Sequence, residues 1–470
     1  MRGSRVGRKS SEANEFPGLG FGPSARKGGN ALVTKSAVRF IILFVGVVCL
    51  SADAADWPMW RCDAARTALS PESLPERLGM CWSRQFTARK PCWDSPLNRD
   101  LMPYDRVFEP VVLGNRLFIG FNDADKMLAL NTETGETVWT HYVDGPVRFP
   151  AVAYDGAVAF ACDDGGLYCL DAATGGLRWR FEGAPRDQRI LGNSRLISTW
   201  PVRGAPVLAD GTLYFGAGIW PFMGTFLYAV DAETGEEVWR NGHEAQRYML
   251  QPHNAPSFAG VAPHGAFVVS GDRLLVPGGR SVPSCFNRRT GEFQYYKLAE
   301  SGKTGGAFVA AVDNAFFAHH REKVTSLYDM ETGERLVSTI GHQPVFSESR
   351  AWFSGPAVTA FDLDQVISRP KNAEDARRWK LDVDASGDLI GAGDTLYAAG
   401  KDSITAIRLP EDGQEPEVFW TTPVDGPVER LVAGAGKLFA VTLDGRILAF
   451  DDSGRAPRKR PAPAHALDPG

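Results

Sequence analysis

The residues best suited to chemistry lie in three stretches that mix arginine with aromatic and amide side chains. They are Arg186 to Gly204, Gly218 to Gly224, and Gln251 to Gly260 with Arg280 following in the next segment. Guanidinium groups bind anions through two parallel hydrogen bonds, and flat rings stack on planar ligands. The mixture therefore suits an anionic, planar or carbohydrate-like ligand. The candidate ligand-binding residues are Arg189, Asn193, Trp200, Arg203, Trp220, His253, Asn254 and Arg280.

The same residues also have a structural explanation. Long insertions need arginine stems and tryptophan rings to pack them against the body of a protein. The residues alone leave both explanations open. No Ser-His-Asp order, Gly-rich phosphate loop or carboxylate pair is recognisable, so no catalytic residue is assigned.

We expect no metal site. His319 and His320 look like a pair, but neighbouring residues on a strand point to opposite faces. The seven cysteines form no CxxC motif, no CxxCH motif and no adjacent pair, which argues against zinc and c-type haem. Cys162 and Cys169 flank a turn, either as a facing pair or as small apolar fillers.

A recurring sequence motif, called the recurring phrase below, predicts the strands that position these residues. Its clearest copy is Ala-Val-Asp-Ala-Glu-Thr-Gly-Glu-Glu-Val-Trp, from Ala229 to Trp239. The phrase predicts a hairpin, in which Asp or Asn starts the turn, Gly takes a positive φ, and the second strand runs on to an aromatic ring. A large ring at one fixed place in each repeat indicates packing between repeats. The expected docking residues are Gly135, Gly175, Gly235, Gly291 and Gly333 with Trp82, Trp139, Trp179, Trp239, Trp379 and Trp420.

The period of this phrase predicts an all-β fold, an eight-bladed β-propeller of four-stranded blades. Seven hairpins are complete, and a final half-blade ends at Asp451 without a last strand. The segment Met80 to Phe86 has the length to supply that strand, so we expect the ring to be closed by an N-terminal strand. A seven-bladed ring with loose ends is the alternative.

The two ends of the chain differ in composition from the repeats. We expect a disordered basic leader at 1–36, a signal peptide or anchor at 37–55, an N-terminal strap at 56–79, the propeller at 80–454, and a disordered tail at 455–470. The apolar run from Ala37 to Leu50 followed by small residues predicts export. The expected location is periplasmic or membrane-associated, with an uncleaved anchor as the alternative.

Charge restricts the partners. Residues 1–54 carry eight basic and three acidic side chains, a local net charge of +5. Because the whole chain has a net charge of −5, the remaining residues have a net charge of −10. An acidic body without a basic stripe argues against nucleic acid. We expect a protein or glycan partner, and a membrane only through an uncleaved anchor.

The phrase from Ala229 to Trp239 resembles the tryptophan-docking motif of the pyrroloquinoline quinone (PQQ) repeat family. That family includes quinoprotein alcohol and glucose dehydrogenases and the BamB-type propeller of outer-membrane barrel assembly. Trp57-Pro-Met-Trp-Arg and Gly218 to Gly224 are similar to segments of exported PQQ-like repeat proteins of planctomycete-type bacteria. The resemblance covers about residues 80–454.

The resemblance implies two classes of function. The first is an exported binding or scaffold module without a cofactor, which is our leading expectation. The second is a dehydrogenase of an alcohol or sugar that uses PQQ and calcium; a glycan-binding propeller is a third hypothesis. The chain lacks the adjacent cysteines that stack on the quinone in these dehydrogenases, and their Glu-Asn-Asp calcium ligands have no match that the sequence identifies.

Overall fold

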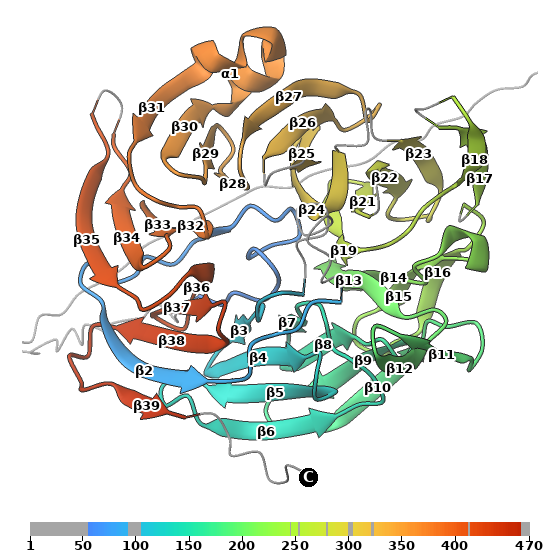
Figure 1. Ribbon diagram of the computed structural model, residues 1–470, viewed down its shortest axis with the longest axis horizontal. Helices are drawn as coiled ribbons and strands as arrows, with labels where there is room; N and C mark the ends of the chain where they lie inside the picture. The colour runs from blue at the N-terminus through green and yellow to red at the C-terminus, as the bar shows by residue number, and fades with distance from the viewer. Residues whose placement is uncertain are drawn as a thin grey trace, which may run out of the picture. The chain divides into compact units, whose positions relative to one another are not determined.

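The computed structural model describes residues 55–92, 105–244, 246–251, 254–278, 281–298, 304–320, 324–411 and 414–461. Within these ranges, eight antiparallel sheets of four strands stand as blades around a ring (Figure 1). The predicted all-β, eight-bladed propeller is confirmed, and the seven-bladed alternative is wrong. The expected leader and almost all of the expected signal segment lie outside the described residues.

In the first seven blades the strands follow the chain from the centre of the ring outward, and blade 8 takes its fourth strand from the N-terminal part of the chain. The first four blades are β3 (Val111–Leu113), β4 (Arg116–Phe121), β5 (Lys126–Asn131), β6 (Thr137–Tyr142); β7 (Val152–Tyr154), β8 (Ala157–Ala161), β9 (Gly166–Asp171), β10 (Leu177–Glu182); β13 (Val202–Ala209), β14 (Thr212–Ala217), β15 (Phe226–Asp231), β16 (Glu237–Asn241); and β20 (Val268–Ser270), β21 (Arg273–Val276), β22 (Ser281–Asn287), β23 (Phe293–Leu298).

The last four blades continue the pattern. They are β24 (Thr304–Val312), β25 (Ala315–His320), β26 (Thr325–Asp329), β27 (Arg335–Gly341); β28 (Pro344–Phe346), β29 (Arg350–Phe353), β30 (Val358–Asp362), β31 (Arg377–Leu381); β32 (Asp388–Ala392), β33 (Thr395–Ala399), β34 (Ser403–Arg408), β35 (Glu417–Pro423); and β36 (Val428–Gly434), β37 (Lys437–Thr442), β38 (Arg446–Asp451), β2 (Gly79–Gln85). Blade 6 also carries α1 (Leu363–Ser368) and the 3-10 helix η4 (Pro370–Ala376).

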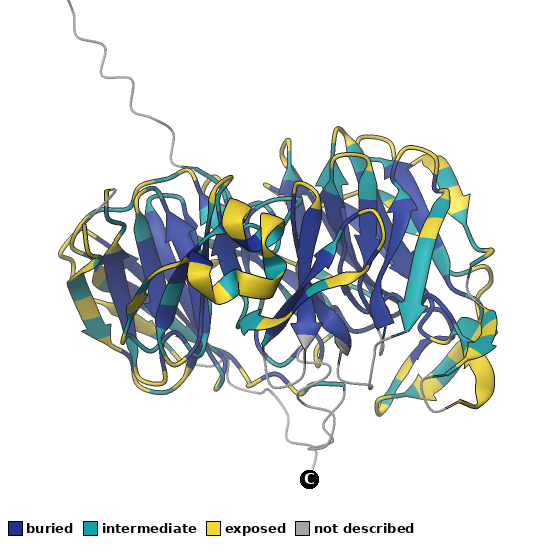
Figure 2. Ribbon diagram, turned by 90° about the horizontal axis from the view of Figure 1, so that it is seen from above, coloured by how far each residue is buried: buried dark blue, intermediate teal, exposed yellow. Residues whose placement is uncertain are grey.

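Burial explains which sequences form which strands. Strand β8 reads Ala-Val-Ala-Phe-Ala and is buried at every position, because neighbouring blades cover both of its faces. Strand β10 reads Leu-Arg-Trp-Arg-Phe-Glu, and its side chains alternate between exposed and half-buried. Figure 2 shows this gradient, with dark-blue strands inside the blades and yellow edges outside.

Neighbouring blades contact each other through the recurring phrase. The Trp139 ring of blade 1 lies against Gly175 in the next blade, where an added Cβ would stand 2.6 Å from a ring carbon. The Trp139 Nε1–H donates to the carbonyl oxygen of Ala172 at 3.0 Å. Trp82, Trp179 and Trp239 donate in the same way to the turns of the blades that follow them. Tyr295 lies against Gly333 in the same manner, and Trp420 donates to Leu78, while Trp379 is half-buried on β31.

The ring is closed by β2, which pairs antiparallel with β38 of blade 8. The predicted closure by an N-terminal strand is therefore confirmed. A further strand, β39 (Arg458–Arg460), pairs in parallel with the outer edge of β2. This differs from the expected unstructured tail, because the three basic residues of β39 gain backbone partners on an open sheet edge and carry no apolar pattern.

The N-terminal strap crosses one mouth of the ring and contacts every blade. Backbone carbonyl groups from Ala55 to Ala68 accept hydrogen bonds of 2.7–3.2 Å from the innermost strands. The donors are the amides of Ala435, Val112, Ala153, Val269, Ala311, Phe346 and Gly391, one from each of seven blades. Arg66 reaches the remaining blade through the Pro206 carbonyl. Just after these contacts, β1 (Leu69–Ser70) pairs in parallel with β32.

Three insertions leave the regular blades. They are the hairpin of β11 (Arg189–Gly192) and β12 (Arg195–Ser198), the 3-10 helix η1 (Pro221–Met223), and the hairpin of β17 (Arg247–Leu250) and β18 (Pro256–Ala259). After the second hairpin, β19 (Gly265–Ala266) pairs in parallel with β13. Among the described residues, no helix has the length and apolarity needed to cross a membrane.

Candidate functional site

A cleft lies at the centre of the ring, on the side opposite the strap backbone. In each blade that contributes to both, the residue bonded to the strap backbone follows the residues that line the cleft, as Ala311 follows Phe308 and Ala435 follows Arg430. The indole of Trp60, from the strap, reaches into it. The cleft measures about 440 Å³, counting the space at its open mouth. Its lining consists of Trp60, Asp105, Glu109, Arg148, Phe149, Pro150, Gly265, Ala266, Ala307, Phe308, Gln343 and Arg430.

A second hollow of about 530 Å³ continues the cleft, because Gln343 and Arg430 line both. Its wall is more polar and includes Arg106, His342 and Glu429. The aromatic side of the cleft is formed by Trp60 and Phe308, whose rings meet edge to face at 5.9 Å. The combined cavity thus has one aromatic end and one polar end.

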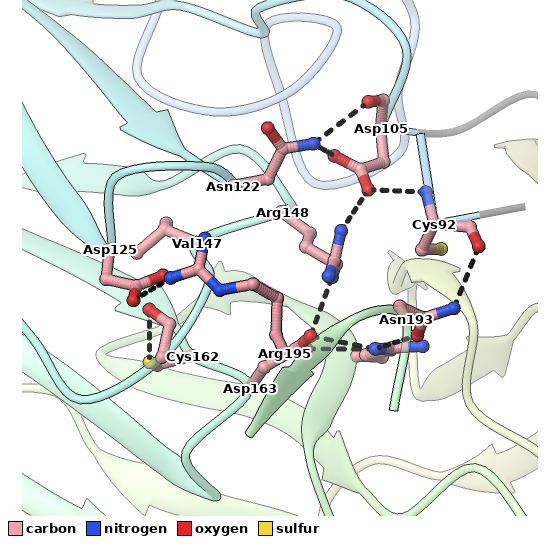
Figure 3. Close-up of polar contacts among 12 residues, drawn as sticks. Cys92, Asp105, Asn122, Asp125, Val147, Arg148, Cys162, Asp163, Asn193 and Arg195 are labelled. Carbon is pink, nitrogen blue, oxygen red and sulfur yellow. Dashed lines mark hydrogen bonds and ion pairs between the residues drawn. The ribbon is translucent and has the colours of Figure 1, made fainter. Parts of the chain in front are cut away.

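A chain of alternating charges forms one wall of the cleft (Figure 3). Asp105 accepts from Arg148 at 2.6 Å, as Figure 3 shows, and also from Arg89 at 2.8 Å. Arg148 also donates to Asp163 at 2.6 Å, and Asp163 accepts from Arg203 through both of its oxygens. All five side chains are nearly inaccessible to solvent. The chain connects the segment before blade 1 to the innermost strand of blade 3.

A second cluster of charges stands across the cleft. Arg430 binds both oxygens of Glu109, at 2.5 and 2.7 Å. Asp388 lies 3.4 Å from Arg430 and 3.5 Å from Arg61 of the strap. These residues come from blades 1, 7 and 8 and from the strap. The two clusters together place every buried carboxylate of the cleft wall against an arginine.

Burial and charge shift the pKa values in these clusters. Burial alone would raise the pKa of Asp163, but Arg203 and Arg148 outweigh it and hold the pKa below its ordinary value of 3.8. Burial dominates at Glu109, whose pKa is raised despite Arg430. His264, beside Arg203, is buried, and burial followed by the charge of Arg203 lowers its pKa to about 3. At neutral pH Asp163 is therefore charged and His264 is neutral.

The carboxylates do not fit a calcium ion. Calcium takes six to eight oxygen ligands and favours carboxylates. Each oxygen of Asp105, Glu109, Asp163 and Asp388 already accepts from an arginine, an amide or a backbone N–H group. In the described ranges, no group of three or more His, Cys, Asp or Glu side chains has the arrangement of a metal site. These oxygens would have to give up their present donors before they could bind calcium.

The structure brings only part of the predicted ligand set to the cleft wall. Arg203 is fully buried and forms the end of the first charge chain. Asn193, at the tip of the β11–β12 hairpin, accepts from Arg203 at 3.0 Å and donates to the Cys92 carbonyl at 2.8 Å. Arg189 lies on the exposed side of that hairpin, 3.6 Å from Asp187. Arg203 and Asn193 thus hold the wall of the cleft and do not face its interior.

The other predicted residues lie farther out. Trp200 is 4% exposed, and its indole donates to the Met223 carbonyl at 2.9 Å, so it anchors η1. Trp220 is 39% exposed on the outside of η1, and Asn254 is exposed in the β17–β18 turn. His253 and Arg280 lie outside the described residues. Of the six predicted residues that the structure describes, Arg203 and Asn193 adjoin the cleft wall, and the other four lie on or beside the insertions.

The insertions instead expose an apolar surface, which we call the ridge. Eight of the thirteen exposed large apolar side chains in the described residues lie on them: Leu191, Leu196, Trp220, Phe222, Met223, Tyr248, Leu250 and Phe258. Helix η1 joins the two hairpins, because Trp200 binds the Met223 carbonyl and Gln246 binds the Phe222 carbonyl. Both hairpins precede the start of an innermost strand, and Figure 1 shows β17 and β18 at the outer edge of the ring.

The sequence analysis did not identify Arg148, Arg430 or their carboxylate partners. A short sequence repeat precedes both arginines and could have indicated them. Asp-Gly-Pro-Val occurs at 144–147 and again at 425–428, each time just before an innermost strand, and Arg148 and Arg430 follow within two residues. Asp105, Asp163 and Asp388 carry no comparable mark, since each resembles an ordinary turn residue.

Comparison with known proteins decides the family. A family model described as "Outer membrane protein assembly factor BamB" matches residues 82–339, which is more than half of the chain. The chain belongs to this family of PQQ-like repeat propellers. The match to the BamB-type family begins at Trp82, on the closing strand β2, and ends within blade 5.

Curated relatives of this BamB-type chain are quinone-dependent enzymes by name. The dehydrogenase subunit of the quinone alcohol dehydrogenase of Gluconobacter oxydans is 35% identical over 127 residues, 24% of this chain and 16% of the relative. The quinohemoprotein alcohol dehydrogenase of Comamonas testosteroni is 26% identical over 209 residues, 40% of this chain and 26% of the relative. The chain thus matches well under half the length of either enzyme.

Solved structures show the same fold. The crystal structure of the Comamonas testosteroni enzyme has a TM-score of 0.58 at 14% identity, covering 86% of this chain and 81% of that one. A europium-containing methanol dehydrogenase has a TM-score of 0.54 at 13% identity, covering 82% of this chain and 89% of that one. At these identities the likeness concerns the propeller fold alone.

Proposed function

We propose that this chain is an exported binding module whose ridge docks a protein partner. The observation that carries the proposal is the concentration of exposed apolar side chains on the three insertions. Phe222 is 61% exposed, Tyr248 66% and Phe258 62%, and these rings lie on insertions that the regular blades do not need. A concentration of exposed apolar side chains is typical of interaction sites.

The composition of the ridge favours a protein over a lipid surface. Protein interfaces are rich in aromatic residues, Met and Arg and poor in Lys. Residues 186–200, 218–224 and 246–260, which contain the three insertions, hold four arginines and no lysine. Several of these arginines bind acidic side chains of the chain itself, as Arg195 binds Asp125 and Arg247 binds Glu244. They therefore offer little net charge to anionic headgroups, and we expect a partner with an apolar strip of its own.

Site-specific photo-crosslinking tests this proposal. A photoreactive phenylalanine analogue replaces Phe222 in the ridge, and in a matched control it replaces Tyr142, which is 71% exposed on β6 of blade 1. We expect a discrete protein adduct from position 222 in cells of the source, lost when Tyr248 and Phe258 are changed to Ser, and none from position 142. Equal labelling at both positions, or adducts to lipid alone, would contradict the proposal.

A quinone-dependent dehydrogenase is the second candidate, and the names of the curated relatives favour it. Titration of the purified chain with PQQ, with and without calcium, tests it through quenching of tryptophan fluorescence. Saturable, calcium-dependent binding at micromolar concentration, weakened in Arg430→Ala, would support the enzyme. The arrangement of the carboxylates leads us to expect no effect of calcium.

A further inference from the structure

The outer edge of blade 8 carries an additional strand. β39 pairs in parallel with β2, so that Trp82 lies opposite Arg458 and Arg84 lies opposite Arg460. In the described ranges, no other blade has a strand outside its fourth one. Exposed sheet edges offer unpaired N–H and C=O groups to an added segment, and proteins use such edges to bind extended peptides. The pairing of β39 therefore shows that this edge accepts an extended segment.

Opposite charges hold the segment beside blade 1. Arg460 donates to Glu136 at 2.7 Å and to the Thr134 carbonyl oxygen at 3.0 Å. Arg455, which precedes β39, lies 3.7 Å from Glu133. Both glutamates belong to the turn between β5 and β6. Because β39 consists of arginine and lysine alone, the contact depends on backbone pairing and charge, and any extended segment with arginines five positions apart supplies both.

The outer edge of blade 1 offers a comparison. Its strand β6 docks on the turn of blade 2 through Trp139, as β2 docks on the turn of blade 1 through Trp82. In the turn of blade 2, Ala173 and Gly176 stand at the positions of the two glutamates. Among the described residues, no strand pairs with the outer edge of β6. The two edges thus share the docking contact and differ in the charge beside them.

The resident segment is held weakly enough to exchange. Both of its ion pairs are exposed to solvent, and such pairs contribute little to stability. β39 pairs with only three of the seven residues of β2. A longer segment in the same register would gain further backbone hydrogen bonds from residues 79–81. The net charge of −10 beyond residue 54 also favours the approach of a basic segment.

We propose that the outer edge of β2 is a docking site for an extended basic segment of a protein partner, which binds parallel to β2 and replaces residues 455–460. Glu133 and Glu136 bind the arginines of that segment, and β2 supplies its backbone partners. The site belongs to blades 8 and 1, whereas the ridge lies on the insertions of blades 2 to 4. The two surfaces are therefore independent.

Disulfide trapping on the full-length chain tests this site, because it requires both the edge and the register. The host carries Ser83→Cys, together with Arg455→Glu and Arg460→Glu to release the resident segment. The probe is a peptide with the sequence of residues 453–461 that carries Lys459→Cys, at the position opposite Ser83. In a glutathione redox buffer, mass spectrometry should show a host–peptide disulfide. A host that keeps both arginines should give about tenfold less, since its tethered segment competes at an effective concentration of about 1 mM.

Matched controls connect the disulfide to the proposed contacts. Thr140→Cys on β6 corresponds to Ser83→Cys, since each follows the docking tryptophan, and should give at least tenfold less adduct in the same host. Glu136→Gln should lower the yield by up to about fivefold. Glu133 is kept, because it also binds the buried Lys437. A peptide with Ala456→Cys in place of the probe cysteine has the wrong register and should give little adduct.

Thermal unfolding verifies that each host is folded, and Arg460→Glu alone replaces the double change if that host does not fold. The proposal is supported if trapping needs the β2 position, the matching register and the carboxylate of Glu136. It is overturned if the folded, released host gives no adduct. It is also overturned if β6 traps the peptide as well as β2, or if the two peptide cysteines react equally.

Discussion

Arg203 holds Asp163 through two parallel hydrogen bonds, from Nε at 2.9 Å and from Nη2 at 2.8 Å. Both side chains are almost fully buried, and Arg148 approaches the same carboxylate from blade 2. One carboxylate thus connects the innermost strand of blade 3 to the segment that precedes β7. The geometry is that of the strongest protein ion pairs.

Arg203→Ala should therefore destabilise the fold by about 3–5 kcal/mol, because it leaves Asp163 buried with a lost partner. Urea unfolding measures the change. The control is Arg178→Ala, whose pair with Asp171 is solvent-exposed, and which should cost at most about 1 kcal/mol. Equal losses in the two variants would show that the buried chain of charges adds nothing to stability.

Acid should weaken the fold partly through His264. Its pKa is about 3 in the folded chain against an ordinary 6.5, so between these values the unfolded chain binds the extra proton. This contribution to stability is present above pH 6.5 and is lost as the pH falls toward 3. We expect His264→Gln to flatten the decline of the urea midpoint between about pH 6.5 and 4. An unchanged slope would contradict the neutral, buried state of the ring.

The docking glycines allow a matched comparison. Gly175→Ala places a Cβ 2.6 Å from the Trp139 ring at a φ of +75°, whereas Gly114→Ala meets nothing within 4 Å at a φ of +52°. The backbone cost of about 1–2 kcal/mol is common to both. Thermal or urea unfolding should show a clearly larger loss for Gly175→Ala, and the difference measures the blade contact. Similar losses would indicate that the ring moves aside freely.

The strap should stabilise the whole ring through Arg66. This buried guanidinium donates to the carbonyl oxygens of Trp60, Asp63, Pro206 and Phe267. Arg66→Met keeps much of the volume but leaves buried carbonyl groups without donors, at about 1–3 kcal/mol each. We expect a fall of several kcal/mol in the free energy of unfolding, or a chain that no longer folds. Arg408→Met, on the exposed surface, is the control and should be near neutral.

The sequence predicts the blades well because their determinants are local. Asp231, Gly235 and Trp239 lie within nine residues, and the same chemistry recurs in the other copies. Ring closure is also predictable, since a half-blade at one end requires a strand from elsewhere. The same requirement predicts that the strand carrying Trp82 pairs with the last strand of the half-blade, β38.

The cleft is harder to predict because its pairs join distant segments. Glu109 and Arg430 are separated by 321 residues, and nothing near either one indicates the other. The sequence predicts Arg203 as a ligand-binding residue, but its type fits a ligand contact and a buried ion pair equally well. Trp200 poses the same ambiguity, which burial resolves as an anchor for η1.

The closing strand has a consequence for how the chain is made. β2 pairs with β38, so the ring cannot shut until the chain has been synthesised as far as Asp451. Until then β2 lacks its antiparallel partner β38, while the blades form one after another along the chain. A prematurely terminated product would keep an open seam and be a ready substrate for proteases. The topology thus acts as a length check, in which only a chain that extends to Asp451 can close the ring.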